Sequence, residues 1–506
     1  MSAIPLTCRN LEPVSRARIP VVAVEAFRRT VRDAVAAGNR LAALYGEPQA
    51  GDAVRLVAVL ADDPAGTLQW LAADPGETYP SLTPDCPQAG GFEREMAEQW
   101  GVKPEGHPWL KPLRFHRRYR PGRDAWARAG DEPPAPSVMN FFRVEGEGLH
   151  EVAVGPVHAG IIEPGHFRFQ CHGEQVLHLE ISLGYQHRGI ERALAGGPHP
   201  RTIHHMETLA GDTTIGHTLA YCQAVEALAG CRVPARAQAL RAVALELERL
   251  ANHTGDLGAL AGDVGFLPTS SFGGRLRGDF LNMTAVLCGS RFGRGLVRPG
   301  GTAFDADDSR VADLRQRLDS TFRDVAGAVN LLWETPSVMA RFESTGVLSR
   351  AAAVELGLVG PAARASGRDM DARRDHPTGI YRFAQIPVSL HDAGDVFARA
   401  YVRWLEIERS VRFIREQIGN LPPGPVRSPC GPMAPNAAVA SIQEGWRGEI
   451  VHAAATDAAG RFARYKVVDP SFHNWMGLAM ALRGMEISDF PLCNKSFNLS
   501  YGGHDL

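Results

Sequence analysis

Cysteines are the first residues of this sequence whose side chains could do chemistry. The 506 residues include eight cysteines, and no two of them form a C-x-x-C pair. So few thiols, scattered over so long a chain, give no disulfide framework. We therefore expect small buried apolar side chains in a reducing compartment: Cys8, Cys86, Cys171, Cys222, Cys231, Cys288, Cys430 and Cys493.

Histidines are the next candidates, and their local placement argues against a metal site. His204 and His205 are adjacent, and neighbouring positions of a helix do not face the same way. His107 lies between Gly106 and Pro108, where a loop is expected. Neither position predicts a metal ligand.

The elements that must position any chemistry divide the chain in two. Residues 21–44 have helical spacing of apolar residues, 54–60 form an apolar run typical of a strand, and 92–101 predict a helix that ends at glycine. We expect a small N-terminal α/β domain over 1–120. Residues 121–137 are rich in proline and glycine, which prevent regular backbone hydrogen bonding. We interpret this segment as a linker.

The second predicted domain covers 138–506. It opens with hairpin-like alternation at Glu151–Gly155, His166–Phe169 and Val176–Ile181 and continues with long amphipathic helices, for example Ala235–His253 and Val396–Ile418. Asp212 can cap a helix that runs to about Ala229. Strand-like alternation of apolar and polar residues returns over 449–468. The fold class expected is α+β, with a mainly helical second domain.

Bulk properties exclude some partners. Lys and Arg (54) nearly balance Asp and Glu (56), so no overall field favours nucleic acid. We find no apolar run of about 18 residues, and the first five residues lack the basic start of a signal peptide. Any membrane link is therefore expected through partners. A basic run predicts a solvated face or a docking surface: Arg114, Arg117, Arg118, Arg120 and Arg123.

Several ordered motifs resemble two subunits of respiratory complex I. Phe92–Glu95 and Pro104–Pro108 are similar to its small peripheral-arm subunit. Its quinone-site large subunit is similar to Gly155–Gly160, Gly184–Glu191, Glu248–His253 and Gly394–Arg399. The fusion of both in one chain resembles the large subunits of group 4 nickel-iron hydrogenases, such as that of formate hydrogenlyase, and His158–Phe169 is closest to those.

The resemblance identifies four positions at which a nickel-iron centre would be held by two C-x-x-C pairs. They are occupied by Ala210 and Thr213 in the early pair and by Ser500 and Gly503 in the late pair. Soft thiolates suit nickel and iron, and these four side chains offer none. We expect no nickel-iron centre, and structural roles for the offset Cys222 and Cys493.

The resemblance also implies a quinone site, in which a histidine of the hairpin loop and a tyrosine bind the head group. His158 and His166 are the two candidates for the histidine, and both stay open. Gly211 stands at the tyrosine position. Tyr185 or Tyr501 could substitute for it.

Ionisable groups surround the emptied site. Glu191 matches the acidic residue that carries protons in hydrogenases, and Arg447 matches an arginine that overhangs the metals. Asp212 and His217 lie nearby in sequence. Such groups can relay protons near pH 7. The alternatives are a structural Glu191–Arg447 pair and a capping role for Asp212.

Together these features predict a subunit of a membrane-associated oxidoreductase. The wider complex, rather than this chain alone, would act on NAD(P)H. An iron-sulfur small subunit would hold a 4Fe-4S cluster and pass electrons to quinone or another acceptor, while this chain alone binds no cofactor. Antiporter-like membrane subunits would hold it at the cytoplasmic face of the inner (cell) membrane. The alternative is a non-redox coupling or scaffold subunit of a proton-translocating complex.

Overall fold

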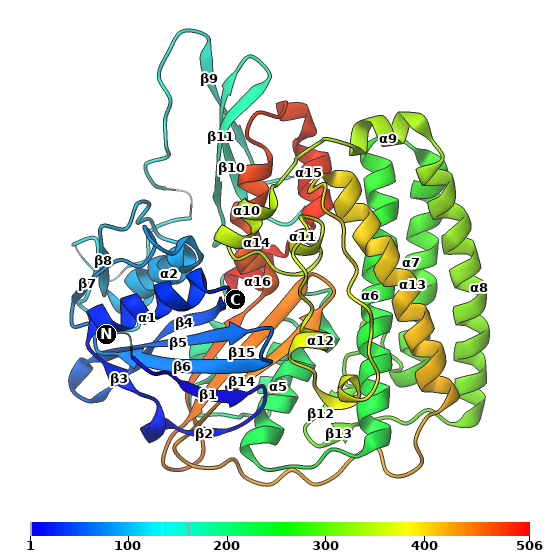
Figure 1. Ribbon diagram of the computed structural model, residues 1–506, viewed down its shortest axis with the longest axis horizontal. Coiled ribbons are helices and arrows are strands. Elements are labelled where there is room, and N and C mark those ends of the chain that lie inside the picture. Colours follow the sequence, from blue (N-terminus) through cyan, green and yellow to red (C-terminus); the bar gives the residue numbers. More distant parts are fainter. Residues whose placement is uncertain (1–2, 129, 131, 137, 159–161) are drawn as a thin grey trace.

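A computed structural model describes residues 3–128, 130, 132–136, 138–158 and 162–506 (Figure 1). Helices and strands both contribute large parts of it, so the predicted α+β class is confirmed. No helix among these residues is long and apolar enough to cross a membrane. The domain boundaries at 120 and 137 stay predictions.

The N-terminal part is built on one mixed sheet in the order β1-β6-β5-β4, with β3 parallel to β6. Strand β5 is buried along most of its length, which explains its continuous apolar run. Helices α1 and α2 pack on the sheet. The bounds are β1 (Leu6–Arg9), β3 (Val21–Val22), α1 (Val24–Ala36), β4 (Arg40–Pro48), β5 (Val54–Asp62), β6 (Thr67–Ala73), β7 (Thr78–Pro80), α2 (Gly90–Trp100) and β8 (Lys103–Glu105).

Two expectations for this part are wrong. The helical pattern over 21–44 stops at Ala36, because Gly38 has a positive φ of 106° and the chain then enters β4. The basic run is not a solvated face: Arg114, Arg118 and Arg120 are buried, and only Arg117 and Arg123 are exposed. Carboxylates pair the buried guanidinium groups, for example Glu77 at 2.9 Å from Arg120.

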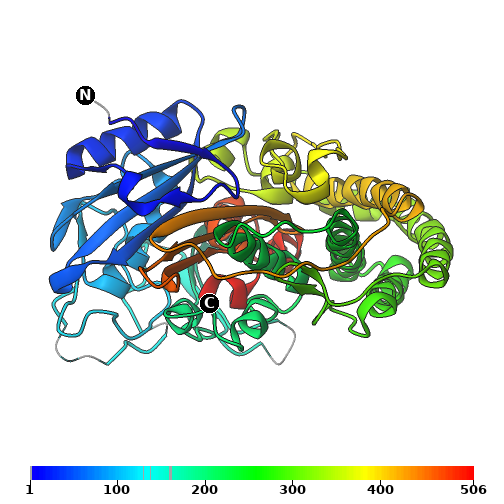
Figure 2. The same ribbon diagram turned by 90° about the horizontal axis from the view of Figure 1, so that it is seen from below.

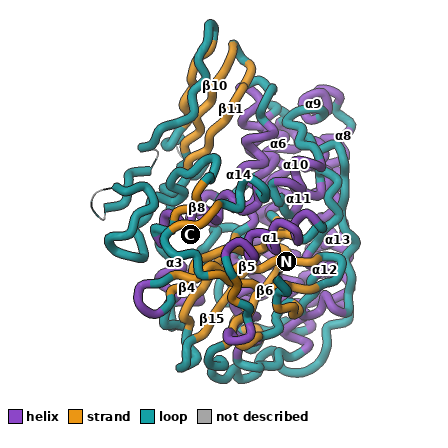
Figure 3. Tube along the Cα trace, turned by 60° about the vertical axis from the view of Figure 1, so that its left-hand side comes forward, coloured by secondary structure: helices purple, strands orange, loops and turns teal. Residues whose placement is uncertain are grey.

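A three-stranded antiparallel sheet in the order β11-β10-β9 projects from the molecule at the top of Figures 1 and 3. Phe167 and Phe169 of β10 are fully buried, and both pack on Phe490 of α15. The predicted hairpin region is thus confirmed, with bounds β9 (Leu149–Val154), β10 (His166–His172), β11 (Gln175–Ser182) and α15 (Phe490–Phe497).

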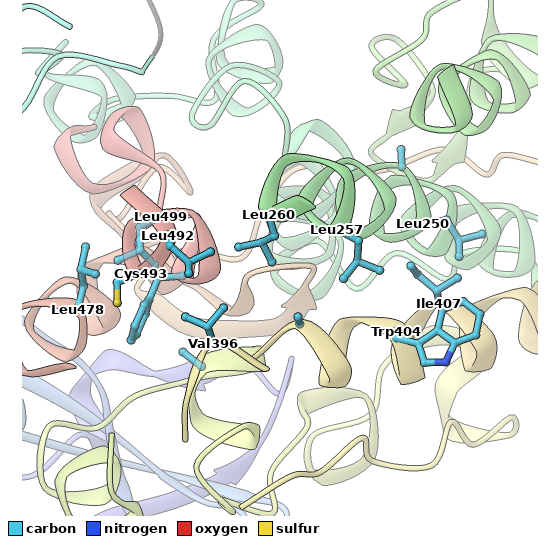
Figure 4. Close-up of a cluster of buried hydrophobic side chains, with 14 of the residues drawn as sticks. Leu250, Leu257, Leu260, Val396, Trp404, Ile407, Leu478, Leu492, Cys493 and Leu499 are labelled. Carbon is cyan, nitrogen blue, oxygen red and sulfur yellow. The ribbon is translucent and has the colours of Figure 1, made fainter. Parts of the chain in front are cut away.

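Long helices form the other end of the molecule. Leu250 and Leu257 of α6 face Trp404 and Ile407 of α13 in the buried cluster of Figure 4. Helices α6 and α7 approach closely, because a Cβ on Gly258 would lie 2.8 Å from the backbone of Gly273. The bounds are α6 (Ala235–Asp263), α7 (Leu267–Cys288), β12 (Val297–Arg298), β13 (Gly301–Thr302), α8 (Asp308–Trp333), α9 (Pro336–Phe342), α10 (Arg350–Glu355), α11 (Gly360–Arg364), α12 (Ala372–Asp375) and α13 (Val396–Gly419).

A second sheet, in the order β16-β15-β14-β2, joins the two parts of the chain. Its strand β2 (Val14–Ser15) comes from the N-terminal part and pairs with β14. Figure 2 shows β14 and β15 between the N-terminal sheet and the helices. The remaining bounds are α3 (Ile190–Leu194), α4 (Thr202–Met206), α5 (Thr214–Leu228), β14 (Ala437–Gly445), β15 (Gly448–Thr456), β16 (Phe462–Val468), α14 (Pro470–Ala481) and α16 (Tyr501–Asp505).

The cysteines largely follow the expectation. All eight are free thiols and six are buried. Cys231 and Cys430 are half-exposed, so full burial is wrong for these two. Both lie in loops, where the Cys231 thiol donates to the carbonyl of Pro429 at 3.4 Å.

Candidate functional site

The segments that carry the early and late ligand positions lie side by side. Arg188 links them, because its guanidinium donates to the carbonyls of Leu209 at 2.8 Å and Gly502 at 3.2 Å. Residues 210–213 precede α5, and Ser500 precedes α16. The tertiary structure therefore brings together the two places in which the resemblance put the missing thiolates.

Arg447 occupies the centre of this site, in the turn between β14 and β15. Its two terminal nitrogens donate to the Asp212 carboxylate at 2.5 and 2.8 Å, and its Nε donates to the carbonyl of Asn498 at 2.5 Å. The guanidinium also lies 3.9 Å from the centre of the Trp446 ring. One side chain thus ties the early segment to the late one by a bidentate ion pair and a hydrogen bond.

Glycines make this position of Arg447 possible. Gly448 and Gly360 have φ values of 132° and 67°, which favour glycine. A Cβ on Gly360 would collide with the backbone of Arg447 and Gly448. The turn therefore packs against α11 at a distance that only glycine allows.

Asp212 does not cap α5, and that expectation is wrong. Residue Thr213 is the N-cap and makes no side-chain capping bond. Glu248 of α6 takes this role instead, because its carboxyl accepts from the amides of Ile215 at 2.6 Å and Gly216 at 3.2 Å. Burial would raise the pKa of Asp212, but the charge and hydrogen bonds of Arg447 hold that pKa below its usual range.

The four expected ligand positions have other local contacts. Ala210 is buried, and the Thr213 hydroxyl accepts from the Trp446 indole at 3.1 Å. The Ser500 hydroxyl caps α16 by accepting from the amide of Gly503 at 2.9 Å. Gly503 leaves room for the carboxylate of Asp469, which a Cβ would touch at 2.7 Å. These side chains offer no soft donor.

Cys222 and Cys493 are both buried, and their structural role stays a prediction. Burial raises the pKa of the Cys493 thiol to about 11, so it stays protonated at neutral pH. Its sulfur packs against Gly346. Among the described residues, no group of three or more His, Cys, Asp or Glu side chains is arranged to hold a metal ion.

A buried chain of hydrogen bonds starts beside the late segment. His217 lies 2.9 Å from the Asp469 carboxylate and 3.1 Å from His452, and His452 lies 2.8 Å from the Tyr465 hydroxyl. Sequence reasoning had named only His217. The Asp469-Pro470 pair is a recognisable signal for a helix start. The Asp469 carboxylate does cap α14, by accepting from the amide of Ser471. His452 and Tyr465 lie on paired strands and gave no signal.

Glu191 does not pair with Arg447, contrary to one of the two alternatives. Its carboxylate accepts from Arg464 at 2.8 Å, from Lys466 at 3.0 Å and from the amide of Val467 at 3.0 Å. Burial would raise its pKa, but these cations lower that pKa strongly. Glu191 is therefore ionised at neutral pH, and its role in proton transfer stays a prediction.

The partners of Glu191 extend into the N-terminal part. Lys466 also donates to Glu95 of α2 at 2.7 Å, and Arg114 pairs with Glu95 as well. We call this set of five buried side chains the α2–β16 charge cluster: Glu95, Arg114, Glu191, Arg464 and Lys466. Through Glu95, it links the segment Phe92–Glu95 of α2 to the second sheet.

The two candidate quinone histidines flank the loop between β9 and β10, of which 159–161 are outside the described residues. His158 lies 2.9 Å from the carbonyl of Gly165, and the buried His166 lies 3.2 Å from that of Gly155. Gly211 is exposed, with no atom within 4 Å of where a Cβ would be.

The two tyrosines considered as substitutes differ in burial. Tyr185 is half-buried. Tyr501 is buried, and its ring lies against Gly165 at the base of the β9–β10 loop. Tyr501 is thus placed beside the loop that carries the two candidate histidines.

Two family models match the chain. The model described as the 30 Kd subunit of respiratory-chain NADH dehydrogenase matches residues 29–131, and the model of its 49 Kd subunit matches residues 263–433. The second match lies within the predicted second domain, 138–506, whereas the first runs past the expected boundary at 120 into the predicted linker.

Three relatives illustrate the similarity. The carbon monoxide-induced hydrogenase of Rhodospirillum rubrum is 33% identical over 352 residues, 69% of this chain and 97% of that protein. Formate hydrogenlyase subunit 5 of Escherichia coli (strain K12) is 31% identical over 451 residues, 84% of this chain and 77% of that protein. Subunit 4 of the NADH-quinone oxidoreductase of Thermus thermophilus is 30% identical over 379 residues, 70% of this chain and 93% of that protein.

These matches confirm the resemblance read from the motifs. This chain therefore belongs to the family of fused 30 Kd and 49 Kd complex I subunits to which the large subunits of group 4 hydrogenases belong.

Proposed function

We propose that this chain is the acceptor-site subunit of a membrane-associated oxidoreductase related to complex I, and that it is not a hydrogenase. An iron-sulfur small subunit supplies electrons from a 4Fe-4S cluster, and quinone or another acceptor receives them next to this chain. The whole complex oxidises NAD(P)H. Antiporter-like subunits hold the chain at the cytoplasmic face of the membrane.

One observation carries the exclusion of hydrogen chemistry. Arg447 pairs with Asp212 of the early segment and donates to Asn498 beside the late one, so it joins the two segments in which the family's thiolates would stand. A nickel-iron centre needs soft anionic sulfur, whereas the side chains here are a methyl, two hydroxyls and a hydrogen, with a guanidinium beside them. The residues present do not fit the metal centre, so no step is routed through one.

The residues also do not reproduce the family's tyrosine–histidine pair for quinone. Gly211 has no side chain to donate, and both ring nitrogens of His166 are engaged, by the Gly155 carbonyl and by Arg168, whereas His158 uses one on the Gly165 carbonyl. The open space in front of the exposed Gly211 supports an acceptor that binds there, next to Asp212. Its head group would lie beside the partly exposed Asp212, which Arg447 holds in place.

A second function is favoured by a buried network along α6 and α13. Arg364 donates to Glu406 at 2.7 Å and to Glu444 at 2.8 Å, and Arg249 donates to Glu406 at 3.1 Å. Burial, partly offset by Arg364, raises the pKa of Glu444 to about 7. A carboxyl that titrates at neutral pH inside the protein supports proton coupling without electron transfer at this chain.

The purified complex separates the two functions. We expect iron but no stoichiometric nickel by elemental analysis, and NAD(P)H-dependent reduction of a quinone analogue that D212N slows at least tenfold. Normal quinone reduction in D212N, with proton uptake abolished by E444Q, would favour the coupling role. Nickel bound in a ratio of one to one would refute the proposed function.

A further inference from the structure

A cavity of about 310 Å³ lies between the N-terminal part and the second part of the chain, and the proposed electron transfer makes no use of it. Its walls come from α2, the loop over 107–113, β11 and α14. Most of the lining is apolar, including Trp109, Leu113, Ile181, Leu183, Trp475 and Met480. The volume is at the small end of the range of about 300–1,000 Å³ that small-molecule sites occupy.

One wall carries a cation without a carboxylate partner. Arg94 of α2 is 8% exposed, and it donates to the carbonyls of Lys111 at 2.9 Å and Pro112 at 2.7 Å. Its guanidinium lies 4.5 Å from the centre of the Trp109 ring. No carboxylate of the described residues forms an ion pair with it, and burial lowers its pKa to about 10.

The nearest carboxylates are engaged elsewhere. Glu180 accepts from Lys111 at 2.6 Å, and Glu98 accepts from the amides of Leu113 at 3.1 Å and Arg114 at 2.9 Å. The negative charges of both carboxylates partly offset the effect of burial on Arg94, although neither carboxylate forms an ion pair with it. A buried cation of this kind is stabilised by an anion that enters the cavity.

Helix α14, which also lines the cavity, carries polar atoms without partners among the described residues. His473 of α14 is 7% exposed, and its Nε2 is buried with no hydrogen-bond partner among the described residues. The indole nitrogen of Trp475 is in the same condition. Burial lowers the pKa of His473 to about 4, so the imidazole is neutral at pH 7 and can donate one hydrogen bond. Such unsatisfied groups are costly in an apolar wall.

We propose that this cavity binds a small carboxylate with an aromatic or aliphatic body, whose anionic head pairs with Arg94 and whose body packs between Trp109 and the aromatic face of α14. The inference does not rest on the proposed electron transfer, because Asp212 and Arg447 are not among the residues that line the cavity.

The test uses the full chain and two probes of equal size, 2-naphthoate and the uncharged 2-naphthamide, in titration calorimetry at pH 7. We expect 2-naphthoate to bind at one site with a Kd of about 1 mM or tighter. R94Q should weaken 2-naphthoate about tenfold and leave 2-naphthamide nearly unchanged. The matched control is R128Q, since Arg128 lies 4.6 Å from the centre of the Trp126 ring outside this cavity; it should change neither.

A second variant keeps the test decisive if R94Q disturbs the loop it tethers. M476W enlarges a partly exposed residue of the cavity wall and should abolish binding of both probes, whereas L331W, at an exposed position of α8, should not. Absence of saturable 2-naphthoate binding to the folded chain would overturn the proposal. So would an equal loss of both probes in R94Q, or loss of the site when partner subunits are present.

Discussion

Replacement of Glu191 by glutamine should destabilise the contact between the N-terminal part and the second sheet. In the α2–β16 charge cluster, two carboxylates face three cations, and all five side chains are buried. Glutamine keeps the shape but leaves Glu95 alone opposite Arg114, Arg464 and Lys466. Removing one partner of a buried ion pair costs about 3–5 kcal/mol, and we expect E191Q to lie in this range.

Guanidinium unfolding of the full chain, followed by tryptophan fluorescence, measures the effect. Because neighbouring cations lower the pKa of Glu191, its contribution is complete above its unfolded pKa of 4.5 and disappears as pH falls through the folded pKa. The gap between wild type and E191Q should therefore be constant from pH 6 to 8 and shrink in acid. Hydrogen exchange should speed up first in peptides of α2 and β16.

A matched control is E151Q. Glu151 pairs with Arg168 at 2.5 Å, but the two side chains are 30% and 24% exposed. Such a pair contributes about 0–1 kcal/mol. If E191Q destabilised the chain no more than E151Q while slowing turnover of the complex, the cluster would not be structural, and the proton-carrying role of Glu191 would be favoured.

Three further predictions concern the site. D212N should cost about 2–4 kcal/mol in denaturant unfolding, because Arg447 stays buried without its bidentate partner; a cost below that of E151Q would contradict the ion-pair argument. G360A should cost at least about 1–3 kcal/mol, since its φ of 67° and the Arg447 backbone leave no room for a Cβ, and unchanged thermal unfolding would refute this. Burial, only partly offset by two amide hydrogen bonds, raises the pKa of Glu248 to about 8. Its contribution to stability should therefore fall as pH rises from about 4.5 to 8, by up to about 1.4 kcal/mol per pH unit; the same slope in E248Q would show that another group titrates.

Local patterns predicted the elements with strong periodicity. The helix over 92–101 appears as α2, and the alternation over 449–468 appears as β15 and β16. The prediction over 21–44 failed because helical spacing continued past Gly38, where the backbone turns and the following apolar residues enter a buried strand instead. Periodicity does not identify the neighbour that an apolar face will contact.

The charged residues were harder to interpret. Arg114 and Arg120 belong to a run that indicates a solvated face, yet the fold buries both against carboxylates from other segments. Asp212 stands at a helix start, yet Glu248 from another helix caps that helix. In each case the deciding partner is distant in sequence.

The sequence by itself determined which atoms the chain can offer. Family membership follows from ordered motifs, and four positions without sulfur remain without sulfur in any fold. Only the tertiary structure decided which charges pair, because Glu191 and Arg464 are 273 residues apart and Asp212 and Arg447 are 235 residues apart. Ion pairing in a low-dielectric interior depends on distance and burial, and both arise only when distant segments come together.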